Sequence, residues 1–568
     1  MAVSLFSFST PNNSYVYDRG TNSLLSALTK DEFLACRRVE TGEETEDDWK
    51  ILNRLTEAGY LKESRLKTIR HSSTSYMRHQ LESRIKQLTI QVTRDCNLRC
   101  SYCAYSGKYN NQRQHESITM PLELMLKCID FAMARSHGLK EVIIAFYGGE
   151  PLLGINKIKS CVEHIKNKYR GRKVRYSMTT NGTIFDDDTI TFLAENDFLI
   201  NISFDGPREL HNLNRVFENG EGSYDIIMKN VKYIKEKYPD FYRKISFLTT
   251  IAPGVDLACV DHFYTAETVL AENYANVNTL TSFSSKEDIY YGDEFSITSN
   301  FQYMKVLLAE IGLYSNEKVS KLFKSRLGTL ALLQRHLSKT MLTETAHPGG
   351  PCLPGIDRPF VDVYGNILPC ERVSEDSNAN RIGHIDTGFD LDKVESVLNV
   401  GKLTEEECLK CWNFINCGLC IASCDGEEEL TRESRLRYCD GAKFDTYSNL
   451  RTICMLTENG YDFKTQTFKK VRTAPDNPHS SCNNATEADK RDLKQQLLTA
   501  INTIVPLTDY NKDDYIFSNA YPLSSTDMVY LIIQLSKDLA FTITDDFIDA
   551  MEMCTFGEFE VLLAKYSK

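Results

Sequence analysis

Three cysteines, Cys96, Cys100 and Cys103, lie on one short segment directly after the strand-like run 88–93. Their CxxxCxxC spacing puts three thiolates on a single loop. Such a loop can hold three irons of a 4Fe-4S cluster and leave the fourth iron open. An open iron can chelate the amino and carboxylate groups of S-adenosylmethionine (SAM). The reduced cluster can then split the sulfonium and give a 5′-deoxyadenosyl radical, while the protein positions the cofactor and excludes water.

This loop, with Tyr102 just before its third cysteine, resembles that of the radical SAM superfamily. The resemblance implies a partial (β/α)6 barrel that binds a 4Fe-4S cluster and SAM. A structural zinc loop is the alternative, but zinc sites usually come as CxxC pairs. A zinc loop would also leave the motifs further along the chain without an explanation.

The elements that must position this loop lie between about residues 86 and 300, where strand and helix patterns alternate. This alternation predicts an α/β fold, with a parallel sheet covered by helices such as 122–134 and 155–169. Parallel barrels place their sites at the C-terminal ends of the strands. The predicted strands are 88–93, 141–147, 174–180, 199–204 and 245–251.

Further motifs fall at the ends of these strands. Gly148, Gly149 and Glu150 follow the second strand. Two glycines let the backbone approach a ligand closely, and the carboxylate can accept from the SAM ammonium group, as the family resemblance implies. His211 is interpreted as a helix-start histidine with a structural hydrogen bond. The resemblance implies contacts to the SAM ribose and carboxylate from Asn181, Ser203 and Arg215.

Within the segment from 350 to about 455, a second group of eight cysteines runs from Cys352 to Cys439. The segment contains a Cx2Cx5Cx2Cx3C run and resembles the SPASM extension of radical SAM enzymes. Two fully ligated 4Fe-4S clusters need eight thiolates, so two auxiliary clusters are expected here. The resemblance assigns the outer cluster to Cys408, Cys411, Cys417 and Cys439. It assigns the inner cluster to Cys352 and Cys370, with Cys420, Cys424 or both.

This segment departs from the common SPASM pattern in its spacing after Cys417 and in having no cysteine between Cys352 and Cys370. The fourth ligand of the inner cluster therefore stays open, and so does the presence there of an iron free to bind substrate. A zinc ribbon is the alternative for this segment, built from Cys408, Cys411, Cys417 and Cys420.

Residues 1–80 form a predicted small module. Residues 5–8 and 15–17 are expected to pair as a hairpin, a capping box at Thr29 and Glu32 opens a helix, and a second helix covers 46–58. The order of elements resembles the winged-helix domain that captures a leader peptide as an added strand. An N-terminal cap on the barrel is the alternative.

The C-terminal part is predicted as a helical connector at 301–349, a polar linker at 473–486 and a helical domain at 487–568. The last domain resembles an acyl carrier protein. Ser525 matches the position of the serine that carries phosphopantetheine, although both neighbouring residues differ from the family triplet. The alternative is a degenerate carrier fold that serves only for docking.

Composition excludes several classes of protein. The net charge of −12, without a basic stripe, argues against a nucleic-acid partner. No run approaches 18 apolar residues, so no membrane span is expected. The 18 cysteines, without a recognisable secretion signal, indicate metal ligation in the cytoplasm.

The leading functional hypothesis is a radical SAM oxidoreductase that modifies a ribosomally made, cysteine-containing precursor peptide, by thioether or other cross-link formation. It needs three 4Fe-4S clusters, SAM, a leader-bearing peptide and a reductant such as flavodoxin or ferredoxin. A sulfatase maturase is the second hypothesis. That family has an aspartate base directly after the cysteine of a Gx4C motif. In this chain the motif runs from Gly365 to Cys370, and Glu371 follows it. A non-catalytic iron–sulfur electron carrier or scaffold is the third.

Overall fold

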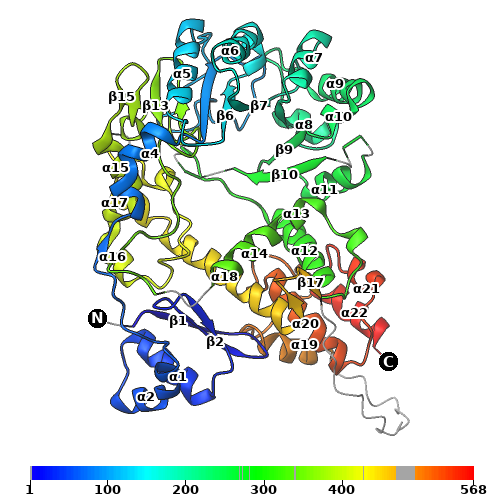
Figure 1. Ribbon diagram of the computed structural model, residues 1–568. Helices are drawn as coiled ribbons and strands as arrows, with labels where there is room; N and C mark the ends of the chain where they lie inside the picture. Colours follow the sequence, from blue (N-terminus) through cyan, green and yellow to red (C-terminus); the bar gives the residue numbers. More distant parts are fainter. Residues whose placement is uncertain are drawn as a thin grey trace.

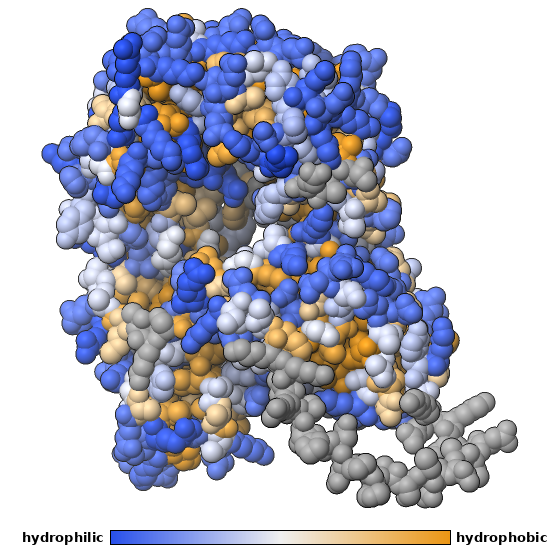
Figure 2. Space-filling model, turned by 45° about the vertical axis from the view of Figure 1, so that its right-hand side comes forward, coloured by the Kyte–Doolittle hydropathy of each residue, from blue (hydrophilic) through white to orange (hydrophobic). Residues whose placement is uncertain are grey.

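The computed structural model describes residues 3–267, 269–270, 273–280, 282–283, 285–337, 341–426, 428–468 and 493–567. The linker predicted at 473–486 lies outside the described residues. The α/β part that follows the N-terminal module lies at the top of Figure 1, the small N-terminal sheet at the lower left, and the C-terminal helices at the lower right. Figure 2 shows the surface hollowed between the α/β part and the helices below it.

A ten-stranded sheet forms the centre of the upper part, in the order β10-β9-β8-β7-β6-β5-β12-β13-β14-β15. The strands from β10 to β5 are all parallel neighbours. Five of them confirm the predicted strands. The sixth, β10, was not predicted, because its sequence YANVNT offers no apolar run and none of its residues is buried. Their bounds are β5 (Gln87–Thr93), β6 (Glu141–Gly148), β7 (Lys173–Thr180), β8 (Leu199–Ser203), β9 (Ser246–Ile251) and β10 (Tyr274–Thr279).

Helices connect the parallel strands and bury their apolar faces against the sheet. The helices predicted at 122–134 and 155–169 correspond to α5 and α6, and their buried residues recur every three or four positions, as one helix face requires. The connecting helices are α5 (Leu122–Ala134), α6 (Ile155–Lys168), α7 (Asp187–Glu195), α8 (Arg208–Asn214), α9 (Tyr224–Lys237), α10 (Pro239–Tyr242) and α11 (Leu257–Ala266).

The cysteine-rich segment extends the same sheet. Strand β12 (Phe360–Val361) pairs in parallel with β5, and an antiparallel meander continues from it. The edge of β5 is therefore covered by a segment about 270 residues later in the chain, where Phe360 pairs with Thr89. The meander consists of β13 (Asn366–Leu368), β14 (Gly383–His384) and β15 (Gly388–Phe389).

The N-terminal segment folds as an antiparallel sheet followed by helices. The predicted hairpin is confirmed, with Phe6 opposite Tyr17, and so is the capping box, in which Thr29 and Glu32 bond each other's backbone. The second predicted helix is broken at Leu52. The elements are β1 (Leu5–Ser9), β2 (Ser14–Asp18), β3 (Ser23–Leu25), α1 (Lys30–Thr41), α2 (Glu46–Ile51) and α3 (Asn53–Glu57).

Short elements surround the cysteine-rich segment and join it to the sheet. Strand β4 (Thr68–Ile69) pairs in parallel with β11 (Thr345–Ala346), so the chain before the first cysteine loop contacts the connector. The long helix α18 begins at Cys439 and has many buried residues. The remaining elements are α4 (Met77–Ser83), α13 (Lys321–Lys324), α14 (Arg326–His336), α15 (Leu391–Leu398), α16 (Glu405–Lys410), α17 (Arg432–Leu436), α18 (Cys439–Glu458), β16 (Tyr461–Asp462) and β17 (Thr467–Phe468).

The C-terminal helices pack against the rest of the protein. Helix α20 (Ser525–Asp538) lies against α12 (Asp293–Glu310) and α18. Buried residues of the C-terminal helices belong to the same hydrophobic core as those of the sheet. The other helices of this part are α19 (Leu493–Asn502), α21 (Asp545–Asp549) and α22 (Phe556–Tyr566).

Candidate cluster and SAM site

The first cysteine loop leaves the C-terminal end of β5 and presents three half-buried free thiols. Backbone N–H groups of the loop point at two of the sulfurs. Leu98 N–H donates to Cys96 Sγ at 3.4 Å, and Tyr105 N–H donates to Cys103 Sγ at 3.5 Å. N–H donors to sulfur stabilise the thiolate form that binds iron.

Two residues predicted to bind SAM lie directly against these thiols. The Asn181 side-chain amide donates to Cys96 Sγ at 3.8 Å, and Arg215 Nη1 donates to Cys100 Sγ at 4.0 Å. Asn181 directly follows β7, and Arg215 directly follows α8, the helix after β8. The segments that follow two neighbouring strands therefore both reach the cysteine loop. The donor set fits a cluster held by three thiolates.

Burial raises the pKa of two thiols strongly, that of Cys96 to about 12 and that of Cys100 to about 11. The thiols therefore hold their protons at neutral pH until a metal displaces them. No three His, Cys, Asp or Glu side chains in the described residues are placed to hold a single metal ion. Thiolates that hold a cluster bind separate irons, so they need not converge on one point.

Gly148 and Gly149 let the end of β6 lie against the start of the cysteine loop. A Cβ on Gly148 would lie 2.3 Å from Thr93 O, and one on Gly149 would lie 1.9 Å from Asp95 O. Gly148 also has a φ of 136°, which side chains rarely allow. The structure thus gives the glycine pair a role in placing the cysteine loop, and its predicted contact with SAM stays a prediction.

Glu150 is fully buried behind the loop. Its carboxylate accepts from Thr180 Oγ1 at 2.7 Å, from Asn181 N–H at 2.7 Å and from Leu152 N–H at 3.0 Å. Burial raises its pKa to about 7, although these hydrogen bonds oppose the shift. Glu150 therefore ties the end of β6 to that of β7. Its contact with the SAM ammonium group stays a prediction.

Asp205 holds the other side of the loop. Its carboxylate accepts from Arg215 Nε at 2.9 Å, from Thr250 N–H at 3.0 Å and from the Tyr102 hydroxyl. The Arg215 guanidinium lies 5.4 Å from the centre of the Tyr102 ring. Ser203, the last residue of β8, is half-buried two residues before Asp205. Sequence reasoning missed Asp205, although a carboxylate at a strand end ten residues before an arginine was a usable signal.

His211 makes structural hydrogen bonds, as predicted. Its Nδ1 accepts from Asp205 N–H at 3.2 Å, and its Nε2 lies 2.9 Å from Ser223 Oγ, which donates to Arg215 O at 2.9 Å. Burial lowers the pKa of His211 to about 2, so the ring is neutral. It fixes the backbone around the Asp205–Arg215 pair.

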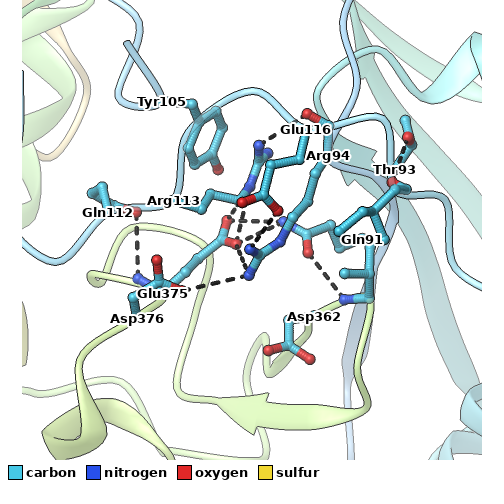
Figure 3. A network of polar contacts seen from close by, with 12 residues as sticks. Gln91, Thr93, Arg94, Tyr105, Gln112, Arg113, Glu116, Asp362, Glu375 and Asp376 are labelled. Atoms are coloured by element: carbon cyan, nitrogen blue, oxygen red, sulfur yellow. Dashed lines mark hydrogen bonds and ion pairs between the residues drawn. The ribbon is translucent and has the colours of Figure 1, made fainter. Parts of the chain in front are cut away.

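A buried polar network that sequence reasoning also missed joins the cysteine loop to the cysteine-rich segment (Figure 3). Gln91 Nε2 donates to both oxygens of Glu375, at 2.9 and 2.7 Å. Arg113 Nε lies 3.0 Å from Glu375 Oε2, and Arg94 Nη2 lies 3.8 Å from it. The Arg113 guanidinium stacks 3.3 Å from the centre of the Tyr105 ring.

The auxiliary cysteines form two groups. The four assigned to the outer cluster line one pocket of about 480 Å³. In the other group, burial raises the pKa of Cys370 to about 11, and the nearby Glu371 and Cys420 act in the same direction. Burial, Asp357 and the nearby Cys420 likewise raise the pKa of Cys352. Cys424 is buried and accepts from Arg435 Nη1 at 3.5 Å. The pocket cysteines are Cys408, Cys411, Cys417 and Cys439.

Glu371 directly follows Cys370 in the chain. One carboxylate oxygen pairs with Arg358, and the other is buried without a hydrogen-bond partner. Burial raises the pKa of Tyr147 strongly, and the nearby Glu371 and Cys103 add to the shift. Tyr147 also packs, together with Cys370, against the buried cluster of Phe360, Leu368 and Val373. Whether Glu371 acts as a base stays a prediction.

Ser525 is buried between α20 and α12. It is 3% exposed, and its hydroxyl donates to Asn300 O at 2.9 Å in α12. The preceding Ser524 caps α20 and forms a capping box with Asp527. The burial of Ser525 favours the alternative of a degenerate carrier fold that serves only for docking. No helix in the described residues is both long and apolar enough to cross a membrane.

Residues 90–265 match the family model described as "Radical SAM superfamily". The "Cysteine-type anaerobic sulfatase-maturating enzyme" of Clostridium novyi (strain NT) is 35% identical over 153 residues, 26% of this chain and 40% of that protein. The "Radical SAM cyclopropyl synthase TigE" of Paramaledivibacter caminithermalis (strain DSM 15212 / CIP 107654 / DViRD3) is 27% identical over 198 residues, 33% of this chain and 41% of that protein.

The solved structure "Native anSMEcpe with bound AdoMet" matches with a TM-score of 0.49 and 22% identity, over 65% of this chain and 99% of that chain. The alignments span only 40% and 41% of the two curated relatives. The family implies a 4Fe-4S cluster and SAM, and the thiols and their N–H donors fit the cluster. Residues 90–265, with the first cysteine loop and the strand ends around it, therefore form a radical SAM domain.

Proposed function

We propose that this protein is a radical SAM enzyme that cross-links a ribosomally made, cysteine-containing precursor peptide. The observation that carries the proposal is the position of Tyr147 at the end of β6, where it packs with Cys370 against the same buried cluster and its ring lies 6.2 Å from that of Phe360. A substrate held at this place would meet the SAM site on one side and auxiliary cysteines on the other.

The proposal requires SAM and three 4Fe-4S clusters. The first loop would hold the cluster that binds SAM, and the pocket between α16, α17 and α18 would hold the outer auxiliary cluster. The inner cluster would use Cys352, Cys370 and Cys420, because a charge on Cys420 raises the pKa of both other thiols. Auxiliary clusters can accept an electron from the substrate or bind its thiolate. A reductant such as flavodoxin or ferredoxin would supply the electron that cleaves SAM.

The N-terminal sheet would bind the leader of the peptide. It ends at β3, whose outer edge pairs with no strand in the described residues. An extended peptide can add to such an edge through main-chain hydrogen bonds. In β1, the strand at the opposite edge of this sheet, Phe6 stacks on Trp412 with ring centres 4.2 Å apart. Trp412 lines the pocket of the outer cysteines. A leader held here would place the following peptide close to the cysteine-rich segment.

Sulfatase maturation is the second candidate, favoured by the likeness to the Clostridium novyi protein. In that reaction Glu371 would act as a base. Its pairing with Arg358 weighs against this role, because the guanidinium already occupies one of the two carboxylate oxygens. A non-catalytic carrier, the third candidate, would not cleave SAM.

The test uses the full chain, reconstituted with iron and sulfide without air, with SAM, reductant and candidate peptides. A cross-link removes two hydrogen atoms and keeps the sulfur, whereas formylglycine formation from cysteine removes the sulfur. Mass spectrometry distinguishes the two. Absence of 5′-deoxyadenosine would support the carrier instead. The triple variant Cys96→Ala/Cys100→Ala/Cys103→Ala should form none, and Cys259→Ala, an exposed cysteine outside the motifs, should behave as wild type.

A further inference from the structure

Arg435 in α17 is a buried arginine between the two groups of auxiliary cysteines. It is 1% exposed. Its Nε donates to Thr404 Oγ1 at 3.2 Å, and its Nη1 donates to Cys424 Sγ at 3.5 Å. Its Nη2 is buried and has no hydrogen-bond partner. Arg435 also lines the pocket that Cys408 and Cys417 line.

No carboxylate forms an ion pair with Arg435 in the described residues. Arginine does not give up its proton in proteins, and an unpaired buried charge is costly. The two carboxylates of the pocket wall are paired elsewhere, Glu407 with Arg432 and Asp440 with Lys443. The negative charge that balances Arg435 must therefore come from other groups that line or fill the pocket.

The thiolates are the groups that can supply this charge. Four thiolates around a 4Fe-4S cluster carry a net negative charge, because they outweigh the charge of the iron–sulfide core. Thr404 extends the contact, since its hydroxyl is 3.2 Å from Cys408 Sγ and also accepts from Arg435. His347 in this region adds no charge, because Gly401 N–H donates to its Nε2 and burial lowers its pKa to about 4.

We propose that Arg435 is the positioning residue and counter-charge shared by the two auxiliary cysteine groups. Its Nη2 has no partner although the residue lines the pocket of the outer cysteines, and its Nη1 donates to the Cys424 sulfur. The inference rests on the proposed function in one respect, that the pocket holds an iron–sulfur cluster. Hydrogen bonds and positive charge beside the cluster favour its reduced form, so Arg435 raises the reduction potential of the outer cluster.

The first test measures potentials by redox titration of the loaded, full-length protein, followed by electron paramagnetic resonance. Arg435→Met should shift one auxiliary signal to a more negative potential and leave the signal of the SAM-binding cluster unchanged. Arg435→Lys should shift it less, because the charge remains. Arg437→Met, an exposed arginine on the same segment, is the matched control. An auxiliary potential equal to that of wild type in Arg435→Met would overturn the inference.

The second test compares thermal unfolding with and without clusters. A buried arginine without its counter-charge destabilises the cluster-free protein, so Arg435→Met should raise the melting temperature of that form. The same variant should lower the melting temperature of the loaded form, because the cluster loses its partner. An arginine with a purely structural role would lower both temperatures on substitution, and that result would overturn the inference.

The iron and sulfide content distinguishes a failure of the proposed function from a failure of the role of Arg435. If wild-type protein binds only enough iron for the first loop, the three-cluster function fails, and the inference fails with it. If the auxiliary clusters are present and the melting temperatures of Arg435→Met change in the same direction, the role of Arg435 alone is wrong. If Arg435→Met loses only the outer cluster while its cluster-free form is stabilised, the inference is supported.

Discussion

Arg215 and Asp205 form a buried ion pair beside Cys100, with Nε 2.9 Å from Oδ2. Arg215→Gln leaves this carboxylate with only its hydroxyl and backbone donors. We expect a loss of about 3–5 kcal/mol in the free energy of unfolding, the cost of breaking a buried pair. Chemical denaturation measures it. The exposed pair of Arg208 with Asp225 is the control, and Arg208→Gln should cost at most ~1 kcal/mol. Equal losses in the two variants would contradict the role of burial.

Gly149→Ala should disrupt the first cysteine loop. The new Cβ would lie 1.9 Å from Asp95 O, so the loop must move, at a cost of roughly 1–3 kcal/mol. We expect the iron content of the reconstituted variant to fall by the amount of iron in one cluster. Gly328→Ala is the matched control, because its Cβ meets nothing within 4 Å and alanine favours helix α14 by about 0.5–1 kcal/mol. Normal iron content in Gly149→Ala would show that the loop tolerates the shift.

Glu150 should make stability depend on pH. Burial raises its pKa from 4.5 to about 7 in the folded protein, so the folded state binds the proton more tightly than the unfolded state. Its contribution is fully present below pH 4.5 and is lost as the pH rises through about 7, a change on the order of 3 kcal/mol. Glu150→Gln should lack this component. Chemical denaturation of the cluster-free wild type and variant at several pH values measures this component. Parallel curves of unfolding free energy against pH for the two proteins would contradict the prediction.

Glu375→Gln should weaken the joint between the first loop and the cysteine-rich segment. It removes the anion that faces the buried guanidinium groups of Arg113 and Arg94 (Figure 3). We expect a loss of about 3–5 kcal/mol in the free energy of unfolding. Glu116, which also pairs with Arg94 but is 41% exposed, is the control, and Glu116→Gln should cost at most ~1 kcal/mol. A Glu375→Gln variant as stable as its control would refute the network.

Ser525 should carry no phosphopantetheine. The full chain, expressed with a phosphopantetheinyl transferase, should show the unmodified intact mass, because Ser525 is buried against Asn300. Ser525→Ala should retain the activity of wild type. Ser524→Ala removes the cap of α20 and should cost ~1 kcal/mol in stability. A mass increase that Ser525→Ala abolishes would show that the helix undocks.

The amino-acid sequence determined what depends on short spacings. It identified the cysteine loop, the glycine pair, five of the six parallel strands and the capping box at Thr29, because each is encoded within a few residues. Strand β10 was not predicted because none of its residues is buried and they show no apolar run. A strand at the edge of a sheet has less apolar area to bury, so its pattern is weak.

Only the tertiary structure decided which distant segments meet. The pairing of β12 with β5, the contact of Gln91 with Glu375 and the burial of Ser525 against α12 all join residues more than 200 positions apart. Nothing in the local pattern of Arg435 showed that it lies between two cysteine groups without a carboxylate partner. Hydrophobic periodicity tells which face of an element is buried, but the partner of a buried charge is chosen by packing across the whole chain.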